Sequence, residues 1–190
     1  MDRSFSQASV WTLPNGLTLL RILLIPFILL FLSFEGKLFS FIAALCFSLA
    51  ALTDLLDGFY ARKWKQKSVL GTLMDPVADK LLIILSLIGL VNLERVPFWI
   101  VEIIVGREIA VTGLRSVAAA KNIILPASRI AKYKTTYQIV AIIGLMIHYQ
   151  YFCINFHKVG IFFLWIALFL TIYSGYNYFR KIFKHNLQHN

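Results

Sequence analysis

The chain has 190 residues, of which 59% are hydrophobic and 15% are charged, and its mean hydropathy is +0.74. A soluble domain carries about 25% charged residues, so the composition excludes an ordinary soluble domain and indicates an integral membrane protein. The formal net charge of +10 comes without the aromatic and basic motifs of a nucleic-acid-binding fold, and we therefore expect no nucleic-acid partner.

The N-terminal segment, residues 1–16, does not have the pattern of a cleaved signal peptide. Its apolar region begins late, is interrupted by Arg21 and lacks a small-residue cleavage site. Phe5, Val10 and Trp11 instead favour a short helix that lies in the membrane interface.

Six apolar runs follow, and a helix needs about 20 apolar residues to cross a bilayer. They are Leu17–Phe34, Leu38–Leu56, Leu73–Leu93, Pro97–Ala120, Ala131–Phe152 and Val159–Phe179. These runs predict one all-α membrane domain over residues 1–190 with six transmembrane helices, and residues 180–190 form a basic tail.

The basic residues are distributed unequally between the two sides of such a protein. Six spans place both termini on one side, and the other side has only Lys37, Arg95 and Lys158. The side with the termini has twelve basic residues: Arg3, Arg62, Lys63, Lys65, Lys67, Lys121, Arg129, Lys132, Lys134, Arg180, Lys181 and Lys184. The positive-inside rule makes this side cytoplasmic. Attraction to anionic lipid headgroups explains most of these residues without a catalytic role.

Four of the nine acidic residues lie between Thr53 and Leu82, at the cytoplasmic ends of the second and third runs. Asp54 and Asp57 are three residues apart and Asp75 and Asp79 are four apart, so each pair shares a helix face. Four carboxylates in a partly desolvated place need a balancing charge. Two hard divalent cations would supply it, and paired metals hold phosphates under attack. Interfacial salt bridges and a proton or cation pathway are the alternatives.

Small residues and an arginine surround these acids and favour a nucleotide diphosphate over a bare ion. Gly58 and Gly71 permit close approach of a ligand to the backbone, and Ala61 is also small. Arg62 has the geometry to bind a phosphate through two hydrogen bonds.

These residues form a pattern, Asp54-x-x-Asp57-Gly58-x-x-Ala61-Arg62, then eight residues, then Gly71-x-x-x-Asp75-x-x-x-Asp79. The pattern resembles the signature of the CDP-alcohol phosphatidyltransferases at every fixed position. The segments Pro14–Arg21, MDPVADK ending at Lys80, Arg107–Ile109 and Lys132–Thr136 are similar to the bacterial subfamily that makes phosphatidylglycerophosphate. The resemblance covers nearly the whole chain, and cardiolipin synthases of the same superfamily have a similar layout.

The resemblance implies a cytoplasm-facing polar cavity in the bacterial inner membrane and transfer of a phosphatidyl group from CDP-diacylglycerol to sn-glycerol 3-phosphate. It implies that Mg²⁺ or Mn²⁺ ions bind Asp54, Asp57, Asp75 and Asp79, that Asp79 also takes the hydroxyl proton, and that the protein is a homodimer. The CDP contacts that it implies are Asn15, Thr18, Asp57, Gly58, Arg62 and Ser68. Helix capping explains Asn15 and Thr18 equally well.

The acceptor brings its own phosphate and needs further cations. Arg115, near the cytoplasmic end of the fourth run, and Lys132 and Lys134, at the start of the fifth, are the candidates. Snorkelling of helix-end cations is the alternative. Arg107 and Glu108 are expected to form an internal ion network without a catalytic role.

Several features have a structural interpretation. Cys46 and Cys153 match no metal spacing and are interpreted as small buried hydrophobic residues. The four histidines, His148, His157, His185 and His189, show no convergent pattern.

Three other functions stay open. They are the same chemistry with another acceptor, such as phosphatidylglycerol, serine or an inositol phosphate, an ion transporter, and a non-catalytic scaffold.

Overall fold

The computed structural model describes residues 13–64, 69–120, 129–151 and 153–188. Within these ranges, side chains are described for residues 16–53, 74–120, 133–151 and 153–180. Most of the expected interfacial segment and the proposed CDP contact Ser68 therefore lie outside the described residues.

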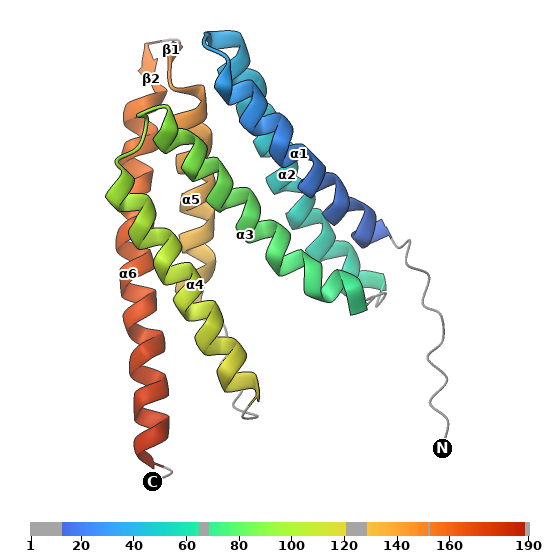
Figure 1. The fold of residues 1–190 in the computed structure, drawn as a ribbon, viewed down its shortest axis with the longest axis vertical. Coiled ribbons are helices and arrows are strands. Elements are labelled where there is room, and N and C mark those ends of the chain that lie inside the picture. The colour runs from blue at the N-terminus through green and yellow to red at the C-terminus, as the bar shows by residue number, and fades with distance from the viewer. Residues whose placement is uncertain (1–12, 65–68, 121–128, 152, 189–190) are drawn as a thin grey trace. The chain divides into compact units, whose positions relative to one another are not determined.

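The described residues form six α-helices and one short β-hairpin (Figure 1). The helices are α1 (Leu13–Ser33), α2 (Lys37–Trp64), α3 (Val69–Asn92), α4 (Phe98–Ala120), α5 (Arg129–Ile147) and α6 (Phe156–Gln188). The hairpin joins α5 to α6, and its strands β1 (Gln150–Tyr151) and β2 (Ile154–Asn155) pair antiparallel, with Gln150 opposite Asn155. The expectation of an all-α architecture is thus confirmed apart from this hairpin.

The helices differ from the apolar runs mainly at their ends. α2 continues from Leu56 to Trp64, and α6 continues through most of the basic segment to Gln188. The predicted fifth span was too long, because α5 ends at Ile147 and the hairpin occupies part of the remainder. The chain turns at His148, which has a φ of 57°, a left-handed conformation that ends a helix.

Contacts within the chain divide it into two compact units, Met1–Gly89 and Leu90–Asn190. In the first unit, α1 packs along α2. Buried apolar residues recur at helical spacing on both helices, with Ile25, Ile28 and Leu32 on α1 and Ala43 and Phe47 on α2. This packing fixes the face of α1 that bears the polar residues of the candidate site.

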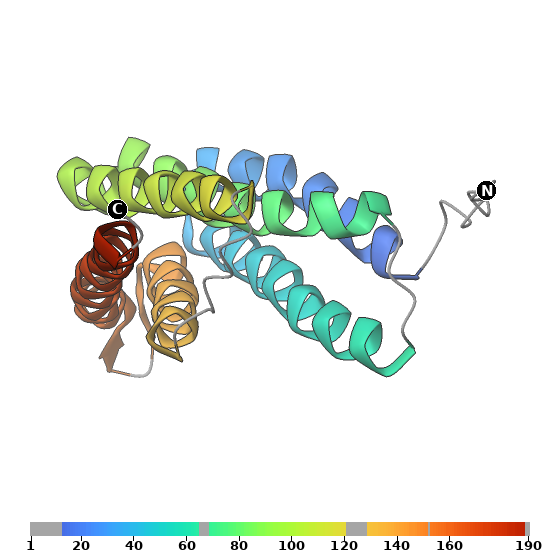
Figure 2. The same ribbon diagram turned by 90° about the horizontal axis from the view of Figure 1, so that it is seen from below.

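In the second unit, α5 and α6 lie side by side and α4 packs on α6, as both ribbon views show (Figures 1 and 2). Glycines allow α5 and α6 to approach each other closely. A Cβ atom built on Gly160 would lie 2.7 Å from the backbone nitrogen of Leu145, and one on Gly144 would lie 3.0 Å from the Cα of Gly160. The α5–α6 contact therefore depends on the absence of side chains at both positions.

The outer faces of these helices carry many large apolar side chains. Leu23, Phe27 and Leu30 on α1 are about half exposed, and Phe169 on α6 is 70% exposed. Among the described residues, two helical segments, Gly16–Ser33 and Phe156–Arg180, are long and apolar enough to cross a membrane by length and composition. An apolar exterior of this kind is typical of a surface that faces lipid.

Candidate active site

Two of the predicted metal ligands, Asp75 and Asp79, lie one turn apart on one face of α3, as their spacing predicts. Both carboxylates are about 40% exposed, at 39% and 38%. They face two polar residues of α1, Thr18 and Arg21, which are three residues apart and also share a helix face. The first unit thus brings together polar side chains from segments more than fifty residues apart in the sequence.

The contacts between these four side chains converge on the Oδ1 atoms of the aspartates. The Thr18 hydroxyl donates a hydrogen bond of 2.6 Å to Asp75 Oδ1. Arg21 Nη1 forms an ion pair with Asp79 Oδ1 and lies 3.9 Å from Asp75 Oδ1. Thr18 is 3% exposed and Arg21 is fully buried, so α1 supplies both polar groups from within the packed unit.

The position of Arg21 indicates whether the two aspartates can bind a metal cation. Its guanidinium, a cation, interacts with both carboxylates, which shows that the pair accepts a positive charge on this face. Partly exposed carboxylate oxygens are also the ligands that Mg²⁺ and Mn²⁺ prefer. The aspartates therefore fit a hard divalent cation. Among the side chains that the structure describes, no group of three or more potential metal ligands converges.

The remaining residues of the predicted carboxylate and CDP site are only partly described. Asp54, Asp57, Gly58 and Arg62 lie on α2, and Asn15 lies on α1, but the described side chains do not include theirs. The convergence of all four aspartates therefore stays a prediction. Thr18, a predicted CDP contact, is placed against Asp75, to which its hydroxyl donates a hydrogen bond.

A second polar cluster lies in the second unit, where helices α4, α5 and α6 contribute to it. Lys134 is 3% exposed and forms an ion pair with Glu108 Oε2. Arg107 Nη1 lies 3.2 Å from the same oxygen, and its Nη2 donates a hydrogen bond of 2.7 Å to Ser174 Oγ. The expected internal ion network of Arg107 and Glu108 is confirmed, and it includes two residues that the sequence did not connect, Lys134 and Ser174.

The structure places the three acceptor-binding candidates differently. Lys134 belongs to the ion network described above. Arg115 is exposed, and its guanidinium carbon lies 5.3 Å from the centre of the Tyr178 ring, a cation–π geometry. The side chain of Lys132, at the start of α5, is not among the described residues. Lys134 and Arg115 are thus held by neighbours on α4 and α6.

Two interpretations drawn from the sequence were wrong in this unit. His148 and His157 do converge, because the hairpin folds α6 back along α5 and brings their Nδ1 atoms to 3.1 Å. Cys153 is exposed rather than buried, because it lies in the hairpin turn with a φ of 65°, whereas Cys46 is half-buried in α2. The pattern of apolar residues in the sequence detects neither the turn at His148 nor the hairpin turn at Cys153.

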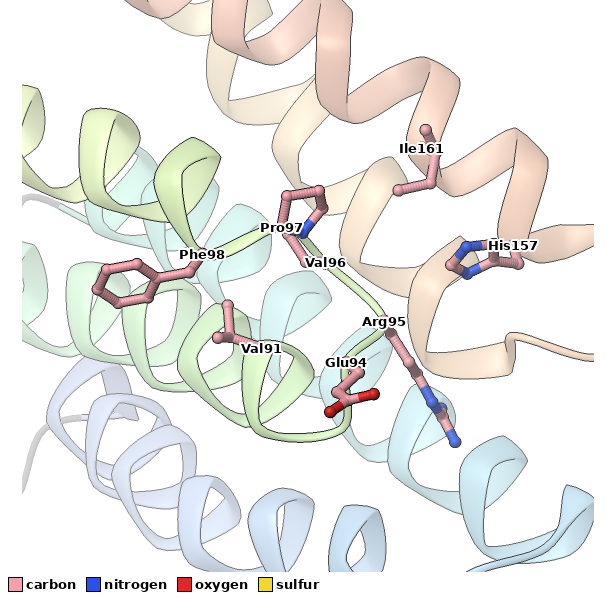
Figure 3. A pocket seen from close by; sticks show the side chains of 8 residues that line it. All are labelled: Val91, Glu94, Arg95, Val96, Pro97, Phe98, His157 and Ile161. Atoms are coloured by element: carbon pink, nitrogen blue, oxygen red, sulfur yellow. The ribbon is translucent and has the colours of Figure 1, made fainter.

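Arg95 caps the C-terminus of α5 next to this histidine pair. It is 9% exposed and donates hydrogen bonds to the backbone carbonyl oxygens of Met146, at 2.8 Å, and Leu145, at 3.5 Å. Cations that bind the last carbonyls of a helix stabilise its C-terminus. Arg95 and His157 also line a pocket of 470 Å³ (Figure 3). None of the predicted catalytic or binding residues lines this pocket, whose other walls are Val91, Glu94, Val96, Pro97, Phe98 and Ile161.

Comparison with known proteins points to one family. The sequence profile of the CDP-alcohol phosphatidyltransferases matches residues 11–173. A Bacillus subtilis protein named CDP-diacylglycerol–glycerol-3-phosphate 3-phosphatidyltransferase is 39% identical over 184 residues, which cover 90% of this chain and 95% of the relative. Proteins of the same name from Rickettsia felis, 40% identical over 91% of this chain and 96% of their own length, and Haemophilus influenzae, 36% identical over 88% and 91%, are also similar.

Proposed function

Because the chain belongs to the CDP-alcohol phosphatidyltransferase family, we propose that it transfers the phosphatidyl group of CDP-diacylglycerol to sn-glycerol 3-phosphate. The products are phosphatidylglycerophosphate and CMP, which places the reaction in phospholipid synthesis. The observation that carries this choice of acceptor is the similarity to relatives named for the same reaction, at 39% and 40% identity over about nine-tenths of the chain.

The reaction exchanges one phosphorus–oxygen bond for another. The 1-hydroxyl oxygen of glycerol 3-phosphate attacks the phosphorus that bears the lipid, the bond from that phosphorus to the CMP oxygen breaks, and Asp79 takes the hydroxyl proton. Asp54, Asp57, Asp75 and Asp79 would hold two divalent cations, Mg²⁺ or Mn²⁺, which neutralise the pyrophosphate and stabilise the charge that develops on it. The face that Asp75 and Asp79 present to the Arg21 cation supports this role for both residues.

The substrates are bound by residues on both sides of the carboxylates. CDP-diacylglycerol would be bound by Asn15, Thr18, Asp57, Gly58, Arg62 and Ser68, with Arg62 binding phosphate through its planar guanidinium. Arg115, Lys132 and Lys134 would bind the phosphate of the acceptor. Burial of Lys134 against Glu108 and the cation–π contact of Arg115 with Tyr178 support fixed positions for two of these cations.

The proposed setting is the bacterial inner membrane, with six spanning helices, both termini in the cytoplasm and the site open to that side. The exposed apolar side chains of α1 and α6 support a lipid-facing exterior. The acyl chains of CDP-diacylglycerol then stay in the bilayer while its headgroup enters the site. Family likeness supports a homodimer.

The experiment that tests this function measures CMP release by the purified protein from CDP-diacylglycerol, with and without Mn²⁺ or Mg²⁺. Glycerol 3-phosphate, phosphatidylglycerol, serine and inositol phosphate are compared as acceptors. We expect metal-dependent release with glycerol 3-phosphate and a loss of at least about 100-fold in Asp79→Asn. Glu102→Gln, which removes an exposed carboxylate from α4, is the matched control and should keep full activity. Full activity in folded Asp79→Asn, or release with another acceptor alone, would contradict the proposal.

A further inference from the structure

Arg21 has no role in the reaction proposed above, yet it is the largest fully buried side chain in the part of the protein that the structure describes. It interrupts the apolar sequence of α1, and its guanidinium interacts with Asp75 and Asp79 on α3. A buried charge is unfavourable unless it is paired, so a fully buried arginine at this place requires an explanation.

The side chains of α1 contact the Oδ1 atom of each aspartate. Arg21 Nη1 reaches the Oδ1 atoms of Asp79 and Asp75, and the Thr18 hydroxyl donates to the same Oδ1 of Asp75 at 2.6 Å. Thr18 and Arg21 lie one turn apart, as do Asp75 and Asp79, so two matched helix faces are joined. The carboxylates are only about 60% buried, whereas the two residues that hold them are almost completely buried.

This arrangement solves an electrostatic problem that exists before any metal binds. Two carboxylates one turn apart on a helix repel each other, and burial strengthens the repulsion. A fixed positive charge beside both of them reduces it, and the aspartates in turn stabilise the buried guanidinium.

We propose that Arg21 is a resident countercharge that keeps Asp75 and Asp79 in position when divalent cations are absent, and that Thr18 is a positioning residue for Asp75. This inference rests on the proposed function, because it takes the two aspartates to be metal ligands. Since Arg21 stays next to them, divalent cations bind against its charge. Removal of that charge therefore destabilises the metal-free protein and tightens the binding of cations.

The experiment measures the melting temperature of the purified full-length chain in EDTA and during a titration with Mn²⁺. Arg21→Gln removes the charge and keeps hydrogen-bond donors, and Arg21→Lys keeps the charge. Asp79→Asn and the double variant Arg21→Gln/Asp79→Asn complete a thermodynamic cycle. Arg95→Met, which removes a buried cation that binds carbonyl oxygens in the second unit, is the matched control.

In EDTA we expect Arg21→Gln to melt about 5 °C or more below the wild type, and the double variant to lose less than the sum of the single variants. The Mn²⁺ midpoint of Arg21→Gln should fall on the order of tenfold, because a repelling charge is gone. Arg21→Lys should restore the wild-type midpoint, and Arg95→Met should leave that midpoint unchanged.

The inference is overturned if the losses in EDTA add up and Arg21→Gln responds to Mn²⁺ at the wild-type midpoint while Asp79→Asn does not respond. Failure of the proposed function has a different signature, namely no Mn²⁺ response in the wild type or a full response in Asp79→Asn.

Discussion

Arg21 and Lys134 are buried cations in two different helices, and each forms an ion pair with a carboxylate that is partly open to solvent. Arg21 is fully buried against Asp79, whose side chain is 38% exposed, and Lys134 is 3% exposed against Glu108, whose side chain is 25% exposed. In both pairs the cation is the more deeply buried partner, so loss of the carboxylate removes a countercharge from a buried cation. Such pairs hold a side chain in position and stabilise its charged form.

His148 makes the stability of the α5–α6 connection depend on pH. It follows the last residue of α5, and burial, together with the nearby Arg95 cation and His157, lowers its pKa below the ordinary value of 6.5. Well above pH 6.5 the imidazole is neutral in both the folded and the unfolded chain. As the pH falls below that value the unfolded chain binds the proton first, so the folded state loses stability.

We therefore expect the melting temperature of the wild type to fall more than that of His148→Asn between pH 8 and pH 5 (both values are about 1.5 pH units from the ordinary pKa). Asparagine tolerates the positive φ of this position, which makes it a suitable neutral replacement. Parallel melting curves for the two proteins across this range would show that His148 does not titrate as the structure implies.

Of the candidate site, the sequence predicted that Asp75 and Asp79 share a helix face, and it did not predict which residues contact them. The spacing of Asp75 and Asp79 was sufficient to place both on one helix face. Their partners Thr18 and Arg21 lie 57 and 58 residues away, and no local pattern relates them to the aspartates. An arginine within an apolar run is itself a functional signal, and this was the feature of the sequence that could have identified Arg21.

At the scale of elements, α5 and α6 make the closest helix contact among the glycines whose surroundings the structure describes. A Cβ on Gly160 would lie 2.7 Å from both the backbone nitrogen and the side-chain Cγ of Leu145, and 3.0 Å from the carbonyl oxygen of Ala141. Backbone atoms cannot give way as a flexible side chain can, so a methyl group here separates the helices.

We expect Gly160→Ala to lower the free energy of unfolding by about 1–3 kcal/mol, as overpacking does in other tightly packed interiors. Gly106→Ala on α4 is the matched control, because a Cβ there meets nothing within 4 Å and alanine favours a helix. Thermal unfolding of both variants checks this, and equal melting temperatures would contradict the close approach.

Each of the six helices among the described residues corresponds to a predicted apolar run, and the ends of the helices were the weaker part of the prediction. Hydropathy does not register the polar extension of α2 to Trp64, because helix formation needs backbone hydrogen bonds and not apolar side chains. It counts Tyr151 as part of a span, although the chain has already turned at His148. Turns set by backbone dihedral angles are therefore the feature that composition could not supply.

At the scale of the whole molecule, the proposed topology places the α5–α6 hairpin on the side opposite the termini. Cys153 lies in this hairpin and is exposed, whereas Cys46 is half-buried in α2. In the proposed topology Cys153 is therefore accessible from outside the cell, and Cys46 lies within a spanning helix.

We expect a membrane-impermeant maleimide to label Cys153 from outside intact spheroplasts, and to leave Cys46 unlabelled. Mass spectrometry measures the label. The Cys153→Ser variant should lose all labelling, which would identify Cys153 as the modified residue. Labelling of Cys153 only after the membrane is opened would mean that the orientation is reversed.

The central claim is that Asp54, Asp57, Asp75 and Asp79 together hold the cations that bind the pyrophosphate of the donor. Electron paramagnetic resonance of Mn²⁺ bound to the purified protein, with and without CDP, tests it most directly. We predict about two bound ions per chain, tighter binding with CDP, and a loss of bound Mn²⁺ in each of the four Asp→Asn variants but not in Glu102→Gln. Mn²⁺ binding at the wild-type level in all four variants would contradict the claim.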